Sequence, residues 1–64
     1  MAKSDLVDIA VQIKHETRAA YLVNDGVQDT WVPKSQCEIA VDRFNPSMGI
    51  LTLPQWLAQE KELI

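Results

Sequence analysis

Residues 17–32 read TRAAYLVNDGVQDTWV and contain the strongest local structural signal in the chain. Residues 17–23 carry apolar groups on both alternating faces, which is typical of a strand covered on both sides. Asn24-Asp25-Gly26 follows, and these residue types tolerate the positive φ angles that tight hairpin turns require. The partner strand should begin near Gln28 and include residues 30–32. The sequence therefore predicts a β-hairpin around residues 24–26.

Three further strands are expected, one before this hairpin in the sequence and two after it. Apolar residues alternate over residues 7–13 and again over residues 37–42, with period two in both stretches. Pro33 removes a ladder donor, so residues 33–36 should form a kink or short turn. Residues 43–49 contain Asn-Pro and Gly breakers and are expected to be a loop, followed by a short fifth strand over residues 50–53.

One helix is expected at the C-terminus. Pro54 suits a first helical turn, and residues 55–63 are good helix formers. Leu53, Trp56 and Leu57 have helical spacing, so this face should dock on the sheet. The predicted fold is mainly β (α+β): a small curved five-stranded antiparallel meander or SH3-like barrel with one short C-terminal helix. Residues 1–64 are expected to form a single domain with residues 1–5 flexible, and the strand order stays open.

Composition limits the function classes. The chain has 64 residues, a net charge of −3, 47% apolar residues and 23% charged residues. It is too short for two domains, too apolar to be wholly disordered and not basic enough for non-specific nucleic-acid binding. Asp5 and Asp8 interrupt any signal-peptide core, and no apolar run approaches a membrane span. We expect a cytoplasmic protein, monomeric or homodimeric, with no membrane association.

The reactive residue types are too few to form a catalytic or metal site. His15 lacks an orienting partner and is expected to be a solvated turn residue. Cys37 occupies an inward strand position, which favours a buried structural thiol, and it leaves no intrachain disulfide. One Cys and one His match no zinc spacing. We therefore expect no enzyme activity, no cofactor and no metal. Core packing is favoured for Trp31 and Trp56, with Trp31 the one candidate for exposure.

The acidic side chains and one loop offer a possible contact surface. Acidic residues such as Asp25, Asp29, Glu38 and Asp42 usually form a solvated polar face. If they lay on one face of the sheet together with Asp8, they would present negative charge to a basic partner. In the 43–48 loop, the two large apolar residues fit a core lid and interface anchors equally well. The candidate partner-binding residues are Asp25, Asp29, Glu38, Asp42, Arg43, Phe44 and Met48.

Two motifs carry a resemblance to a known family. Residues 31–36 read WVPKSQ, and residues 53–58 read LPQWLA. In these segments the chain resembles a family of small phage and mobile-element proteins that share a Trp-x-Pro-Lys-Ser-Gln core and a C-terminal Pro-x-Trp-Leu-Ala helix. The resemblance covers roughly residues 19–64. Cys37 replaces the aliphatic residue expected there, and the loop over residues 43–49 looks longer than usual.

The resemblance implies a phage or prophage origin and no single activity. Small phage proteins without catalytic groups often act by binding, so we expect a protein that occludes a site on a host protein. A host-defence inhibitor such as an anti-CRISPR protein is one form of this function, reached by analogy from size and origin. The alternatives are a nucleic-acid binder that uses Trp31, Lys34 and Arg18, and a phage structural or assembly factor.

Overall fold

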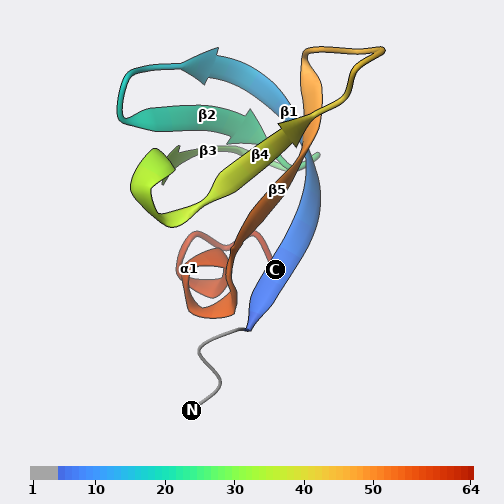
Figure 1. The fold of residues 1–64 in the computed structure, drawn as a ribbon. Coiled ribbons are helices and arrows are strands. Elements are labelled where there is room, and N and C mark those ends of the chain that lie inside the picture. The colour runs from blue at the N-terminus through green and yellow to red at the C-terminus, as the bar shows by residue number, and fades with distance from the viewer. Residues whose placement is uncertain (1–4) are drawn as a thin grey trace.

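The protein is a single five-stranded antiparallel sheet with one short C-terminal helix, as the sequence predicted (Figure 1). The computed structural model describes residues 5–64. The flexible segment expected over residues 1–5 lies outside the described residues except for Asp5, whose carbonyl accepts a hydrogen bond from the Gln55 N–H at 2.8 Å. The elements are β1 (Leu6–Glu16), β2 (Ala20–Asn24), β3 (Asp29–Pro33), the 3-10 turn η1 (Lys34–Gln36), β4 (Glu38–Val41), β5 (Met48–Pro54) and α1 (Gln55–Glu60).

The strands do not follow one another across the sheet as in a continuous meander. Their order is β3-β2-β1-β5-β4, so β5 lies beside β1 and β4 forms the far edge. Pro33 lies on an edge strand with its backbone turned away from β2, so its missing N–H removes no bond to β2, and the Lys34 N–H still bonds to the Ala19 carbonyl at 2.8 Å. The 3-10 turn η1 then directs the chain away from β3. The chain then returns as β4, which pairs with β5 alone.

Strand β1 is long enough to pair with two neighbouring strands along different parts of its length. Its residues 6–12 pair with β5 and its residues 12–16 pair with β2. The register shifts between Ile13 and His15, and a bulge of this kind bends a strand and increases its twist. The sheet consequently curls, and Figure 1 shows β4 passing in front of β2 and β3.

His15 lies within β1, which extends to Glu16, and not in the turn expected for it.

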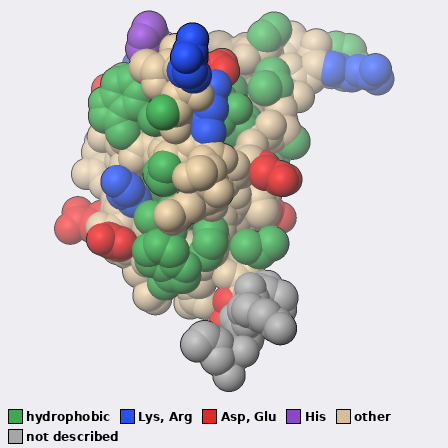
Figure 2. All heavy atoms as spheres, turned by 60° about the vertical axis from the view of Figure 1, so that its left-hand side comes forward, with side chains coloured by type: hydrophobic (Ala, Val, Ile, Leu, Met, Phe, Trp, Pro, Cys, Tyr) green, Lys and Arg blue, Asp and Glu red, His purple; other side chains and the backbone are tan. Residues whose placement is uncertain are grey.

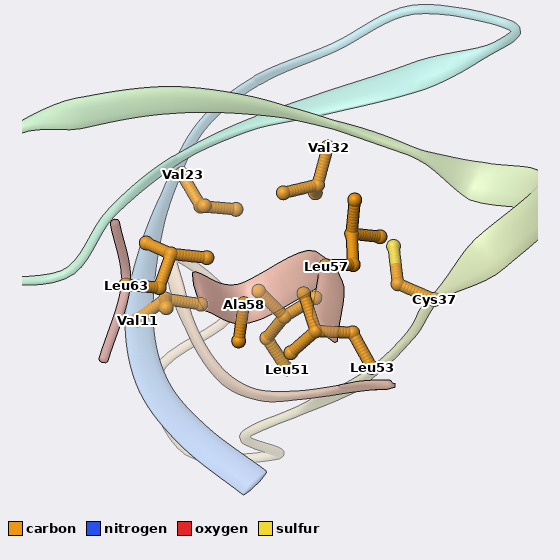
Figure 3. Packing of buried hydrophobic residues seen from close by; sticks show 9 residues of the cluster. All are labelled: Val11, Val23, Val32, Cys37, Leu51, Leu53, Leu57, Ala58 and Leu63. Carbon is orange, nitrogen blue, oxygen red and sulfur yellow. The ribbon is translucent and has the colours of Figure 1, made fainter. Parts of the chain in front are cut away.

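The concave side of the curled sheet holds the core. Alternate residues of four strands point inward and meet the helix, which agrees with the period-two pattern of the sequence. Figure 3 shows these side chains converging from the sheet and from α1. The buried apolar residues are Val11, Val23, Val32, Cys37, Leu51, Leu53, Leu57, Ala58 and Leu63.

The helix is shorter than predicted. It ends at Glu60, where the Glu62 N–H bonds to the Gln59 carbonyl and the Leu63 N–H to the Ala58 carbonyl at 2.8 Å. Glu62 has φ 61°, so the helix ends in a Schellman motif with glutamate at the left-handed position where glycine is usual. This turn directs Leu63 into the core.

The prediction that Trp56 packs in the core is wrong. Its side chain is 56% exposed, whereas the neighbouring Leu57 and Ala58 are buried. A helix of this length has room for only one narrow buried stripe, and the two smaller residues fill it.

The fifth strand is also longer than expected, because it begins at Met48 and ends at Pro54. No helix in the described part of the chain has the length and apolarity to span a membrane.

Candidate functional site

Strand β4 exposes one of its backbone edges. The Asp42 N–H bonds to the Met48 carbonyl at 2.9 Å, which fixes the hydrogen-bonding pattern between β4 and β5. In an antiparallel ladder the backbone groups of alternate residues point to opposite sides. Ala40 and Asp42 therefore face β5, while Ile39 and Val41 direct their N–H and C=O groups to the other side. Among the described strands none pairs with β4 on that side.

The inward side of β4 is only partly covered. Val41 lies opposite Gly49, which has no side chain to pack against it, and Val41 is 53% exposed. A Cβ atom at Gly49 would meet the Ala40 carbonyl oxygen and Ile39 Cγ2, each at 2.9 Å. Glycine is therefore required for β4 to lie this close to β5. The same glycine leaves Val41 available as an apolar contact beside the open edge.

The outer face of β4 carries the acidic residues. Glu38 and Asp8 both lie beside Thr52, one on each neighbouring strand, so the three form a row across the sheet. The Thr52 hydroxyl donates to an Asp8 carboxylate oxygen at 2.7 Å. Asp42 lies beyond the other end of β4 on the same face as Glu38, because residues two apart share a face. Ala40 lies between the two β4 acids.

The loop that connects β4 to β5 is braced by its own side chains. The Asp42 carboxylate accepts the Phe44 N–H at 2.8 Å. Asn45 accepts the Ser47 hydroxyl at 2.8 Å, and its carbonyl accepts the Met48 N–H at 2.9 Å. These bonds fix a short turn.

The same loop holds Phe44 outward. The Phe44 side chain is 90% exposed, so it does not form the core lid, which was one of the two roles considered for it. Met48 is half-buried, and Arg43 lies in the loop beside Phe44.

Asp25 and Asp29 belong to the β2–β3 turn. The Asp25 carboxylate accepts the Val27 and Gln28 N–H groups at 2.9 and 3.0 Å, and Asp29 accepts the Asn24 side-chain amide at 2.8 Å. The bonds from Gln28 and Val27, in that order, lower the pKa of the Asp25 carboxyl. These two carboxylates thus shape the turn. Glu38, Asp42, Arg43 and Phe44 instead follow one another along β4 and the β4–β5 loop, and Met48 begins β5 directly after that loop.

The two motifs of the family resemblance meet in space. Residues 34–37 and residues 52–54 line one shallow cavity of about 350 Å³. Cys37 lies at its wall and donates its thiol proton to the Pro33 carbonyl, with 3.0 Å between sulfur and oxygen. Burial first, and the neighbouring Glu38 carboxylate second, raise the pKa of the Cys37 thiol. Cys37 is therefore a protonated structural thiol, as the sequence predicted. The lining residues are Leu6, Lys34, Ser35, Gln36, Cys37, Glu38, Thr52, Leu53 and Pro54.

The second candidate surface lies on the opposite edge strand. Trp31 is 44% exposed, so its core role was wrongly predicted and the exposed alternative holds. Its ring meets His15 edge-on, with 6.1 Å between ring centroids. Lys34 forms an ion pair with Glu16, and its ammonium lies over the Tyr21 ring, 4.8 Å from the centroid. Lys34 is thus already engaged within the protein.

The vacant backbone edge of β4 could not be predicted from the sequence. The alternation over residues 37–42 places Ile39 and Val41 on the same side as the inward Cys37, but their vacant backbone edge depends on β4 being last in the strand order, which no local pattern encodes. Within residues 5–64 no three His, Cys, Asp or Glu side chains are grouped so that they could hold a metal ion. Comparisons with protein-family models, with curated proteins and with solved structures found no match to this chain.

Proposed function

We propose that the protein is a small non-enzymatic binding protein that occludes a site on a host protein through the β4 edge and the adjoining residues 42–48. The observation that carries this proposal is the exposure of Phe44 in a braced loop beside the outer edge of β4, which pairs with no other described strand. Burying a large aromatic side chain in a partner would remove its apolar surface from water. The internal bonds of the loop fix its shape before binding, which lowers the entropic cost of ordering it.

The resemblance of residues 31–36 and 53–58 to phage and mobile-element proteins supports a partner in a bacterial host. Inhibition of a defence system, for example as an anti-CRISPR protein acting on a nuclease or effector complex, is the specific form that we propose. The acidic residues Glu38 and Asp42 support this form, because proteins that hold nucleic acids present basic grooves. An acidic strand edge could compete with the nucleic acid for such a groove.

Affinity capture from bacterial lysate with three matched baits tests the proposal. The baits are the unaltered protein, Phe44→Ala and Val27→Ala, each checked for folding by circular dichroism. Val27 is 87% exposed and lies in the β2–β3 turn, so its truncation is a control for losing an exposed apolar side chain. We expect the unaltered protein and Val27→Ala to capture the same partner and Phe44→Ala to lose most of it.

The charge of the edge is tested separately with Glu38→Lys. We prefer Glu38 to Asp42 for this change, because Asp42 also caps the loop through the Phe44 N–H. Folded Glu38→Lys should capture less partner than the unaltered protein. Retention of the partner by both Phe44→Ala and Glu38→Lys would contradict the proposed surface, and failure of the unaltered protein to capture any specific partner would contradict the function.

Nucleic-acid binding is the second candidate, favoured by the exposure of Trp31. Figure 2 shows His and several Lys or Arg side chains at one end of the molecule, beside hydrophobic groups. Base stacking on Trp31 with phosphate contacts from Arg18 would use this end. The ion pair between Lys34 and Glu16 weakens the case, since it neutralises one cation. A gel shift at low salt that disappears in Trp31→Ala would favour this candidate over the first.

A further inference from the structure

We propose that the partner adds a β-strand to the open edge of β4, and that this strand carries two basic residues four positions apart. This inference rests on the proposed function and names the chemistry of the partner segment. Ile39 and Val41 each offer one N–H and one C=O group on the vacant side of β4. An extended segment would satisfy all four groups in the same ladder that β4 already makes with β5.

The other edge of the sheet is less suited to this pairing. The Lys34 N–H bonds to the Ala19 carbonyl at 2.8 Å, so the alternating pattern turns the backbone of Trp31 and Pro33 outward on β3. Pro33 has no N–H to donate, and proline is a common device for blocking an exposed edge. Strand β4 contains no proline and no bulge. The two edges are thus unequal, and β4 is the one that can receive a strand.

Side chains on β4 define what the added strand should contain. Residues directly opposite one another in adjacent strands have neighbouring side chains on the same face. Basic residues would therefore lie opposite Glu38 and Asp42, with a small residue opposite Ala40 between them. On the inner side, apolar residues would contact Ile39 and the half-covered Val41. The resulting pattern is basic, apolar, small, apolar, basic.

A second copy of this chain fits the edge poorly. Antiparallel pairing of two β4 strands about Ala40 would place Glu38 directly opposite Asp42 of the other copy, twice. Like charges directly opposite in a sheet are destabilising, and acidic residues at an edge oppose self-association. The two acids that would attract a basic strand would thus also oppose the protein pairing with itself.

Peptide titrations of the full isotopically labelled protein, followed by the NMR shifts of its amides, test the proposal. The probe is the peptide TKVAVKT, and the matched control is TEVAVET, which has the same backbone and apolar residues. We expect TKVAVKT to shift the Ile39 and Val41 amides and to bind about tenfold more tightly than TEVAVET, because two ion pairs replace two like-charge contacts. Glu38→Gln should reduce this difference, and high salt should reduce it further.

Three outcomes decide the inference. Absence of shifts at Ile39 and Val41, or equal binding of the two peptides, would overturn it. If the peptide fails while lysate capture still depends on Phe44, the added strand is wrong and the proposed function stands. If the peptide binds and capture depends on neither Phe44 nor Glu38, the proposed surface for the host partner is wrong and strand addition at β4 stands.

Discussion

Single residues in a strand, a turn and a helix end control how the elements of this small protein lie. Gly49 allows β4 to approach β5, Asp25 closes the β2–β3 turn, and Glu62 takes the left-handed position that ends α1. Of these three, only the turn around Asp25 could be predicted, because Asn-Asp-Gly is a local signal. The need for Gly49 arises from contacts with another strand, and glutamate at a helix C-terminus gives no warning of a left-handed residue.

The Asp25 carboxylate should make stability depend on pH. Hydrogen bonds lower its pKa in the folded protein, so its contribution is complete above the unfolded pKa of about 3.9 and is lost as the pH falls through the lower folded pKa. Asp25→Ala should be less stable at neutral pH and should lose less further stability on acidification. Urea denaturation across this pH range measures both effects. Val27→Ala, in the same turn, should keep the original acid dependence, and an unchanged dependence in Asp25→Ala would contradict the assignment.

At the scale of elements, the strands were predictable and their partners were not. Alternation over residues 7–13 and 37–42 is a local property, and strands form there over Leu6–Glu16 and Glu38–Val41. The pairing of β1 with β5 joins segments more than thirty residues apart, and no residue pattern specifies it. The helix was found but its buried side was misjudged, because Trp56 and Leu57 are adjacent and spacing alone favours neither.

Truncation of the adjacent helix residues Trp56 and Leu57 should affect the stability of the protein very differently. Leu57→Ala should lower the free energy of unfolding by about 2–5 kcal/mol, because it leaves a cavity between α1 and the sheet. Trp56→Ala should change it by less than about 1 kcal/mol, because that side chain is mostly exposed. Chemical denaturation of the two variants and the unaltered protein measures both losses in the free energy of unfolding. Equal losses, or a larger loss for Trp56→Ala, would contradict the position of the helix.

At the scale of the whole molecule, the core and the candidate surface use different residues. The nine buried apolar residues all face the concave side of the sheet and α1. The residues predicted for partner binding lie outside this core, in β4, the β4–β5 loop, the β2–β3 turn and the first residues of β3 and β5. The sequence could predict the side chains Glu38, Asp42 and Phe44 as candidates. It could not predict that a vacant backbone edge lies beside them, because that edge results from the strand order.

The vacancy of the β4 edge underlies both the proposed binding surface and the added strand, and amide hydrogen exchange of the free protein measures it directly. We predict rapid exchange at Ile39 and Val41 and slow exchange at Ala40 and Asp42, whose N–H groups face β5. Addition of the captured host partner should slow exchange at Ile39 and Val41. Protection of these two amides to the level of Ala40 in the free protein would contradict a vacant β4 edge, because the edge would already be occupied.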